Sequence, residues 1–336
     1  MSHLCALIYR MLIAIERRVS ATELGRKIKR TALARAAYGA LYRRFHPPTV
    51  IAAVGAHRLH LDPADTIITR SLLVYGGAWE PLETETFVSL LRNEMVVVDI
   101  GAHIGYYTVL AARAVGSQGR VYAFEPTPKN YDLLCRNVQE NGYNNVVTVP
   151  MAVADATGTA RLVLSDKSSG LNKLCRYSSE QRSIEVATTT LDDFFSNYDG
   201  RLDVIKMDTE GAEPMILVGM QRLLHRYHDL AIFTEFFPRA IQDFHNSPED
   251  FLQQLRKQGF QMFHLNEEDH GLQPFSLDRL NALMPELLRE HNYWPTINLL
   301  CVRGQWVFEV QRLYHINPLH SRADRHLRTF NQVAGA

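Results

Sequence analysis

The stretch "VVVDIGAHIGYYT" (Val96–Thr108) decides the fold of this 336-residue chain. An unbroken apolar run ends in Asp99, and Gly101 and Gly105 follow it. Runs of this kind, rich in Val and without polar alternation, are typical of strands in parallel sheets, which are buried on both faces. The glycines permit a sharp turn and let a ligand or a neighbouring strand approach the backbone closely. The stretch therefore predicts a buried strand, a tight turn and a helix, a unit that commonly holds a nucleotide.

The same rhythm continues towards the C-terminus. Further strands are predicted, in order, in "GRVYAFEP", "NVVTVPMAV", "ARLVLSD", "IEVATTTLDDFF", "DVIKMD" and "LAIFTEFF", with a polar loop over 167–183. Helices are predicted in "PKNYDLLCRNVQENG", "EPMILVGMQRLLHRY" and "PEDFLQQLRKQG", and a final antiparallel pair in "FQMFHLNEE" and "TINLLCVRG". Strands and helices that alternate with short connections form right-handed crossovers. We therefore predict a doubly wound α/β sheet.

The N-terminal part has a different character. Residues 1–46 are helical in composition, "HPP" at 46–48 ends this segment, and "VIAAVGAHRLHLD" predicts a small hairpin. A short helix is predicted over 83–91. We therefore expect a helical N-terminal extension over 1–47, a main domain over 48–305 and a C-terminal tail, helical or loose, over 306–336.

Charge is balanced over the whole chain, with 36 basic and 36 acidic residues, so it gives no argument for a nucleic acid partner. It is uneven locally, since residues 1–46 contain ten Arg or Lys and two acids. We favour a solvated helical extension that packs on the main domain or on a second subunit of a homo-oligomer. The alternative is peripheral contact with an anionic membrane surface.

Three further features bear on the compartment. The four cysteines are scattered, and no pair has metal-ligand or redox spacing. The apolar N-terminus is interrupted by Arg10 and has no clear cleavage site, so a signal peptide is not expected. No apolar run approaches the roughly 20 residues that span a bilayer. The expectation is a reduced, cytoplasmic protein, with membrane association left open.

Two cofactors suit a strand, glycine turn and helix: a dinucleotide and S-adenosylmethionine. Dinucleotide turns prefer G-x-G-x-x-G, which leaves room for a pyrophosphate. Here the third glycine is absent, and Tyr106 and Tyr107 occupy the place that a phosphate would need. Asp99 brings a carboxylate near a cationic methionine end, and Glu125, roughly 20 residues after the turn, is placed to accept hydrogen bonds from ribose hydroxyls. S-adenosylmethionine is favoured, and a plain strand–helix turn stays an alternative.

A second stretch, "DVIKMDTEGAE", places Asp208, Glu210 and Glu213 at the end of a buried strand. Charged groups at such a place are costly unless they are paired, solvated or used in chemistry. Glu213 is also suited to the N-terminus of a helix, which favours negative charge. Glu235, in "FTEFF", adds an acid on the same edge. Asp208, Glu210 and Glu235 have the hard oxygen ligands of a divalent metal site, a possibility that we do not favour.

Together, "VVVDIGAHIGYYT", "AFEPTPKNYDLLCRNVQENG", "MAVADATG", "TTLDDF" and "DVIKMDTEGAE" resemble the FkbM family of S-adenosylmethionine-dependent methyltransferases. The resemblance covers roughly 50–303. It implies a seven-stranded Rossmann-like sheet with a reversed C-terminal β-hairpin. It also implies methylation of oxygen, commonly a hydroxyl of a sugar, glycan or natural-product small molecule. A catalytically silent protein that binds S-adenosylmethionine or acts as a scaffold, a nicotinamide-dependent oxidoreductase, and nitrogen as the acceptor atom stay open.

The resemblance also implies site residues. The expected catalytic residues are Asp208, Glu210 and His103. The expected cofactor-binding residues are Asp99, Gly101, Ala102, Gly105, Tyr106, Glu125, Pro126, Met151, Ala152 and Asp208. Met151 and Ala152 would flank the adenine or belong to the core.

His103 departs from the turn that is usual in the family, Asp-x-Gly-Ala-Asn. Histidine is enriched in left-handed backbone conformations, as asparagine is, so we favour a conservative turn substitution. The alternative is that His103 faces the cofactor or the acceptor and makes activity depend on pH near its titration.

Overall fold

A computed structural model describes residues 3–20, 22, 31, 37, 39–41, 44–45, 50–65, 67–165, 169–175, 182–288 and 296–316. The chain divides into two compact units. Unit 1 contains the described residues within Met1–Trp79 and Ser165–Leu171, and unit 2 contains those within Glu80–Leu164 and Asn172–Arg328. None of the described helices has the length and the apolar character that crossing a membrane requires.

The described part of unit 1 includes the helices α1 (His3–Ser20) and α4 (Ile68–Val74) and a hairpin. Helix α1 packs on α4, and the strands β1 (Val50–Val54) and β2 (His57–Leu61) pair antiparallel, as predicted. Tyr9 and Ile13 of α1 form a small apolar cluster with Val74. Much of the rest of the predicted extension, and residues 317–336 of the predicted tail, lie outside the described residues.

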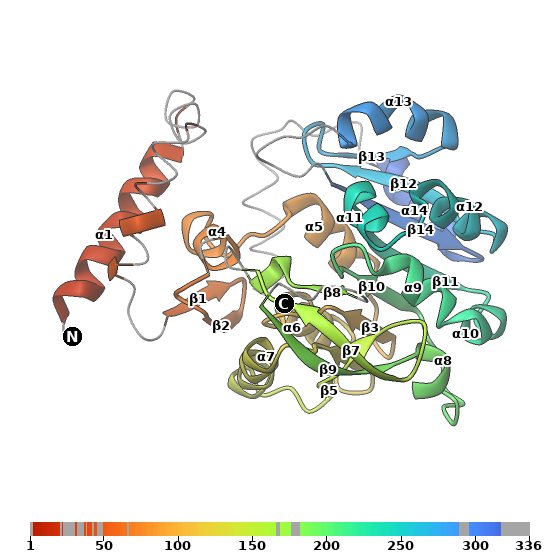
Figure 1. Ribbon diagram of the computed structural model, residues 1–336, viewed down its shortest axis with the longest axis horizontal. Helices are drawn as coiled ribbons and strands as arrows, with labels where there is room; N and C mark the ends of the chain where they lie inside the picture. Colours follow the sequence, from red (N-terminus) through yellow and green to blue (C-terminus); the bar gives the residue numbers. More distant parts are fainter. Residues whose placement is uncertain are drawn as a thin grey trace. The chain divides into compact units, whose positions relative to one another are not determined.

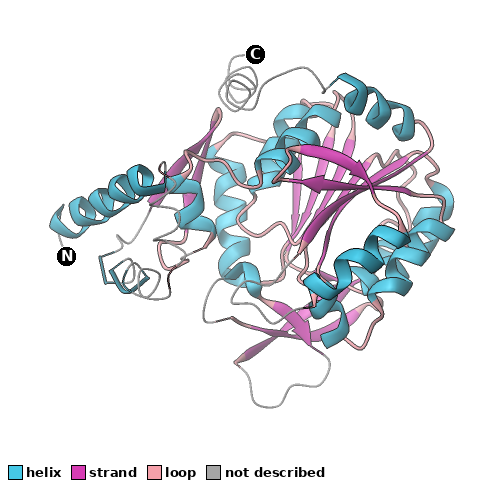
Figure 2. Cartoon of the chain, turned by 90° about the horizontal axis from the view of Figure 1, so that it is seen from above, coloured by secondary structure: helices cyan, strands magenta, loops and turns pink. Residues whose placement is uncertain are grey.

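Unit 2 is built on an eight-stranded sheet in the order β13-β12-β14-β11-β10-β3-β4-β5 (Figure 1). Its strands are β3 (Val96–Ile100), β4 (Arg120–Phe124), β5 (Val146–Val149), β10 (Val204–Met207), β11 (Leu230–Phe236), β12 (Gln261–Asn266), β13 (Gly271–Pro274) and β14 (Ile297–Arg303). The five strands from β5 to β11 are parallel, and helices lie on both faces of the sheet (Figure 2). The doubly wound α/β arrangement is thus present.

The C-terminal edge of this sheet differs from the prediction. The sheet has eight strands, not seven, because β13 extends the edge beyond β12. The predicted antiparallel pairing of β12 with β14 is present, but β13 and helix α13 (Leu277–Leu287) lie between them in the chain, so the tight hairpin is the one from β12 to β13. The sequence of β13, "GLQP", is short, half-exposed and without an apolar run, so no burial pattern marks it.

A second, four-stranded sheet has the order β6-β9-β7-β8. The strand predicted in "NVVTVPMAV" is divided between the two sheets, because β5 ends before Pro150 and β6 (Ala152–Val153) pairs with β9 (Ser183–Thr189). Proline has no N–H to donate to a ladder. Within the predicted loop over 167–183, the structure describes β8 (Lys173–Cys175), which pairs with β7 (Gly158–Val163), and a 3-10 helix (Ser169–Leu171). Residues 166–168 and 176–181 lie outside the described residues.

Helices connect the strands of unit 2. They are α5 (Pro81–Leu90), α6 (Tyr106–Ala114), α7 (Pro128–Glu140), α8 (Leu191–Phe194), α9 (Glu213–Val218), α10 (Gln221–Arg226), α11 (Pro238–Asp243), α12 (Pro248–Lys257), α13 and α14 (Trp306–Ile316). The single helix predicted after β10 is two helices, α9 and α10. They separate at Gly219, where a Cβ atom would lie only 2.2 Å from the carbonyl oxygen of Ala154. The close approach of another backbone segment therefore requires glycine here.

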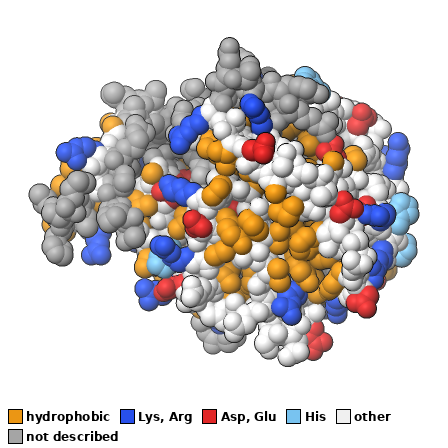
Figure 3. All heavy atoms as spheres, turned by 60° about the horizontal axis from the view of Figure 1, so that its bottom comes forward, with side chains coloured by type: hydrophobic (Ala, Val, Ile, Leu, Met, Phe, Trp, Pro, Cys, Tyr) orange, Lys and Arg blue, Asp and Glu red, His pale blue; other side chains and the backbone are white. Residues whose placement is uncertain are grey.

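The main core fills one face of the large sheet. Alternate residues of the central strands, among them Val98, Ile100, Ile205 and Met207, pack with side chains of α9, α10, α12 and α13. On the molecular face in Figure 3, acidic and basic side chains are interspersed around an apolar area, as the balanced charge of the chain predicts.

Candidate functional site

The predicted site residues come together at the carboxyl ends of the parallel strands of unit 2. The glycine turn follows β3, Glu125 follows β4, Asp208 follows β10, and Glu235 lies near the end of β11. These four strands are neighbours in the sheet, so their ends form one continuous edge. Doubly wound α/β folds bind their ligands at this edge.

The glycine turn is packed between the two neighbouring strands. The N–H groups of Gly101 and Ala102 donate to the carbonyl oxygen of Phe124, at 3.0 and 2.9 Å. A Cβ at position 101 would lie 2.0 Å from the carbonyl oxygen of Asp208, and Gly101 has a φ of +79°. Gly105 has a φ of +88° and begins α6. The backbone of Asp208 thus occupies the space that a side chain at position 101 would need, so the close packing of the strand ends requires glycine here.

His103 has a left-handed φ of +52°, the conformation expected for a turn substitution. Its backbone N–H donates to Oε2 of Glu125 at 2.9 Å, and the N–H of Thr127 donates to Oε1 at 2.8 Å. Glu125 itself is 4% exposed. Each oxygen thus receives one backbone donor, which fixes the orientation of the carboxylate and leaves further lone pairs free to accept hydrogen bonds.

Asp99 is buried in β3 and accepts a hydrogen bond from Oγ1 of Thr108 at 2.5 Å. Burial raises the pKa of Asp99 from 3.8 to about 6, although the Thr108 hydroxyl opposes the shift. A positive charge placed near this carboxyl would favour its ionised form.

The other predicted cofactor residues surround the turn. Tyr106, at the start of α6, is buried against Tyr107 with their ring centroids 5.2 Å apart. Pro126 lies partly exposed between β4 and α7. Met151 packs against the main core, and Ala152 is buried in the core of the smaller sheet. These last two have the contacts of core residues.

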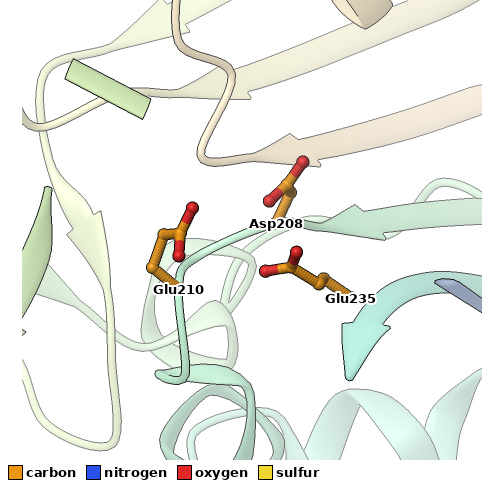
Figure 4. Close-up of side chains that lie close together, drawn as sticks. All are labelled: Asp208, Glu210 and Glu235. Atoms are coloured by element: carbon orange, nitrogen blue, oxygen red, sulfur yellow. The ribbon is translucent and has the colours of Figure 1, made fainter. Parts of the chain in front are cut away.

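The acids that follow β10 and β11 form a cluster. One carboxylate oxygen each of Asp208, Glu210 and Glu235 lies within 4.8 Å of the others, and the three side chains point toward one another (Figure 4). Within the described part of the chain, Oε2 of Glu235 is buried and has no hydrogen-bond partner. Burial, and then the charges of Glu210 and Asp208, raise the pKa of Glu235 well above its usual value. The cluster can hold a proton, a hydroxyl donor or a divalent cation.

Glu213 lies beside this cluster in sequence and is the first residue of α9, at the helix N-terminus as predicted. Its Oε1 accepts hydrogen bonds from the N–H of Thr209 at 2.8 Å and from the Thr209 hydroxyl at 2.7 Å. The side chain is fully buried, and burial raises the pKa of Glu213 from 4.5 to about 7.

Sequence reasoning missed the cation of the site, Lys206 of β10. It is 2% exposed, and its Nζ lies 3.3 Å from Oδ2 of Asp208 and 3.5 Å from Oε1 of Glu83. Nζ also lies 4.3 Å from the ring centroid of Tyr107, a cation–π geometry. Burial lowers the pKa of Lys206, but the surrounding carboxylates outweigh burial and raise it, so the side chain is charged.

Two residues of α5 and its start, Glu80 and Glu83, complete the acidic side of the site. The Tyr107 hydroxyl donates to Glu83 at 3.1 Å and to Glu80 at 3.3 Å, and Nδ2 of Asn298 donates to Glu80 at 3.0 Å. Burial, and then the charge of Glu83, raise the pKa of Glu80 well above its usual value.

One signal in the sequence pointed to Lys206: residues two apart in a strand share a face, so the lysine of "KMD" lies on the face of Asp208. No comparable signal marked the two glutamates.

The fold and the site define a Rossmann-like α/β domain with a glycine turn and an acidic cluster at the carboxyl edge of its sheet. Residues 99–262 match the model of the methyltransferase FkbM domain. The match confirms, over this part of the chain, the resemblance that its motifs predicted.

Individual relatives are more distant. Methyltransferase sdnD of Sordaria araneosa is 27% identical over 164 residues, which cover 40% of this chain and 63% of that protein. A protein-L-isoaspartate O-methyltransferase of Methanococcoides burtonii is 36% identical over 59 residues, 18% of this chain and 29% of that protein. The chain thus spans less than two thirds of the length of these curated relatives.

Solved structures also match, at low similarity. TYW2 of M. jannaschii in complex with AdoMet is 15% identical, with a TM-score of 0.38, over 77% of this chain and 88% of that one. An S-adenosylmethionine-dependent O-methyltransferase of Thermotoga maritima is 13% identical, with a TM-score of 0.35, over 67% of this chain and 66% of that one.

Proposed function

We propose that this chain is an S-adenosylmethionine-dependent O-methyltransferase that methylates a hydroxyl of a sugar, glycan or natural-product small molecule. The observation that carries the proposal is that one sheet edge brings together a glycine turn, a carboxylate fixed by backbone N–H groups and a cluster of carboxylates. The FkbM family match over 99–262 supports the reaction class.

The residues at the β3 and β4 ends fit the cofactor. Gly101 and Gly105, both with a positive φ, would shape the turn that contacts the cofactor. Glu125 would accept hydrogen bonds from the two ribose hydroxyls, because its carboxylate is already oriented by two backbone N–H groups. Asp99 would lie toward the cationic methionine end, with Ala102, Gly105, Tyr106 and Pro126 as neighbouring contacts. Met151 and Ala152 would border the adenine by apolar and backbone contact.

When bound, S-adenosylmethionine supplies an electrophilic methyl group on a sulfonium centre. The chain has to place the acceptor oxygen in line with that methyl group and remove the hydroxyl proton. An alcohol hydroxyl ionises only far above neutral pH, so a base within hydrogen-bond reach is needed. Asp208 and Glu210 are the carboxylates that we assign to this task.

The neighbouring residues set the state of this base. Lys206 contacts one oxygen of Asp208, which leaves the other oxygen to accept from the acceptor hydroxyl. Burial and the charges of Glu210 and Asp208 raise the pKa of Glu235, which favours its protonated form, and this form can donate a hydrogen bond within the cluster. His103 orients Glu125 through its backbone N–H, and its partly exposed imidazole lies on the same turn.

Calorimetric titration of the purified chain with S-adenosylhomocysteine tests the cofactor assignment. We expect Glu125→Ala to weaken binding by about tenfold to a hundredfold, the range for a lost charged hydrogen-bond partner. The matched control is Glu185→Ala, because Glu185 is exposed on β9, away from the sheet edge that carries the site. Absence of binding to folded wild-type protein would remove the methyltransferase assignment and leave a scaffold role.

A second step tests the transfer itself. Hydroxylated acceptors are screened for formation of S-adenosylhomocysteine, and Asp208→Asn is compared with wild type on any acceptor that reacts. Loss of a positioned base typically costs about a hundredfold or more in rate. An Asp208→Asn variant that binds the cofactor and transfers methyl groups at the wild-type rate would exclude Asp208 as the base.

A further inference from the structure

Helix α1 has one face that is buried within unit 1. Tyr9, Ile13, Glu16 and Ser20 have exposed fractions of 4%, 9%, 1% and 9%. Glu16 pairs with Arg70 of α4, with 2.5 Å between Oε1 and the guanidinium nitrogen. This face therefore supplies the contacts that hold α1 in its unit.

A second face of α1 is apolar and exposed. Leu7, Met11 and Ile15 are 56%, 55% and 47% exposed, although large aliphatic side chains are usually buried. They are spaced four residues apart, so they form one stripe along the helix. Because successive helical residues turn by about 100°, this stripe lies roughly opposite the buried face.

The charges around the stripe are all positive. Arg10 and Arg18 are exposed, and Arg17 donates hydrogen bonds to the carbonyl oxygen of Leu73. The one acid of α1, Glu16, is buried in its ion pair with Arg70. The basic excess of residues 1–46, ten Arg or Lys against two acids, has the same sign. An exposed apolar stripe with arginines along it complements a surface that is negatively charged outside and apolar beneath.

We propose that unit 1 binds an anionic lipid surface through α1, with Leu7, Met11 and Ile15 entering the boundary between headgroups and acyl chains. Arg10 and Arg18 contact lipid phosphates. Helices that bind in this way lie in the plane of the membrane, and their affinity grows with the buried apolar area and with the attraction of basic residues to anionic lipids. This proposal does not depend on the methyltransferase assignment.

The positive charge of α1 favours a lipid surface over a second copy of this helix as the binding partner of the stripe. In a homodimer through this stripe, the arginines of both copies would face one another without an exposed acid on α1 to pair with them. Like charges across an interface oppose association. A bilayer with anionic headgroups supplies the missing negative charge.

Sedimentation of the full chain with vesicles tests the proposal. Vesicles of phosphatidylcholine are compared with vesicles that contain about 30% phosphatidylserine, the kind of anionic lipid that attracts basic segments. We expect binding to the anionic vesicles, weakened at least about tenfold when salt is raised from about 0.1 M to about 1 M, because salt screens surface charge.

Two variants separate the apolar and the basic contributions. Leu7→Ser/Met11→Ser/Ile15→Ser removes only exposed side chains, and we expect it to weaken vesicle binding at least about tenfold, since burial of each apolar side chain contributes. The matched control is Val218→Ser/Phe308→Ser, which removes the exposed apolar residues of unit 2, 53% and 73% exposed, and should bind as wild type does. Arg10→Glu/Arg18→Glu should remove the preference for anionic vesicles.

Several results would overturn the proposal. Wild-type protein that ignores both kinds of vesicle excludes it, and so does binding that is unchanged in the triple serine variant. Light scattering measures whether the chain is a monomer or a dimer. A wild-type dimer that becomes a monomer in the triple serine variant, with no vesicle binding, would assign the stripe to a second copy of this chain.

Discussion

The two halves of the carboxyl edge of the large sheet differ in how fully their acids are satisfied. On the β3–β4 side, both oxygens of Glu125 accept backbone hydrogen bonds, and Asp99 accepts one from Thr108. On the β10–β11 side, Asp208, Glu210 and Glu235 crowd within 4.8 Å, and Oε2 of Glu235 is buried without a hydrogen bond among the described residues. Buried polar atoms in folded proteins are nearly always bonded.

The β3–β4 side is therefore a preformed half, because the protein's own hydrogen bonds fix its carboxylates. The β10–β11 side is a second half that contains a buried carboxylate oxygen without a hydrogen bond among the described residues. A fixed carboxylate recognises one ligand with little reorganisation, as a cofactor shared by a whole family requires. The buried Oε2 of Glu235, inside a crowded group of carboxylates, can pair with a hydroxyl group of a bound ligand. The first half therefore suits an invariant ligand, and the second suits a variable one.

The largest expected effect comes from the cation of the second half. Lys206→Met leaves Glu83 buried without its ion pair and removes the contact with Asp208, so we expect a loss of about 3–5 kcal/mol in the free energy of unfolding. Urea denaturation measures it, with Lys257→Met, an exposed lysine of α12, as the control. A loss no larger than that of the control would mean that the carboxylates are neutral in the folded chain and need no cation.

The next effect concerns the preformed half. Gly101→Ala places a Cβ 2.0 Å from the carbonyl oxygen of Asp208 and strains a positive φ, while Gly142→Ala carries similar strain, at a φ of +70°, with nothing within 4 Å. Subtracting the control isolates the clash, which we expect to cost about 2–3 kcal/mol. Thermal unfolding and S-adenosylhomocysteine titration measure it. Equal effects of the two variants would show that β3 and β10 can separate at this edge.

The smallest effect is a pH dependence set by Glu213. Its pKa is raised from 4.5 to about 7, so between these values the unfolded chain loses a proton that the folded chain keeps. Stability from this group is therefore complete below pH 4.5 and falls as pH rises toward the folded-state pKa of about 7. Glu213→Gln retains an acceptor for Thr209 and should flatten this slope relative to Glu185→Gln. An unchanged slope would assign the pH dependence to other acids.

Much of the fold could be predicted because buried strands have a simple signature. The strands β3, β10 and β11 are mainly apolar, since both faces of a central parallel strand are covered. The sequence analysis did not predict β13, the division of one strand at Pro150 or the division of one helix at Gly219. They depend on pairing partners and on the approach of Ala154, which are remote in sequence.

The site could be predicted in part for a related reason. The carboxyl ends of parallel strands meet at one edge, so acids that follow them, such as Asp208 and Glu235, must lie close together. Glu80 and Glu83 reach the same edge from α5, through packing against Tyr107 and Lys206. No periodicity in the sequence encodes that contact.

The burial of Lys206 gives the folded chain a built-in reporter of local opening. Acylating reagents attack a neutral amine that solvent can reach, and Lys206 is 2% exposed and held in its charged form by Glu83 and Asp208. In native protein we expect such reagents to modify the exposed Lys257 and to leave Lys206 intact. Acylated Lys206, counted by mass spectrometry, therefore measures how often β10 and α5 separate while the rest of the molecule remains folded.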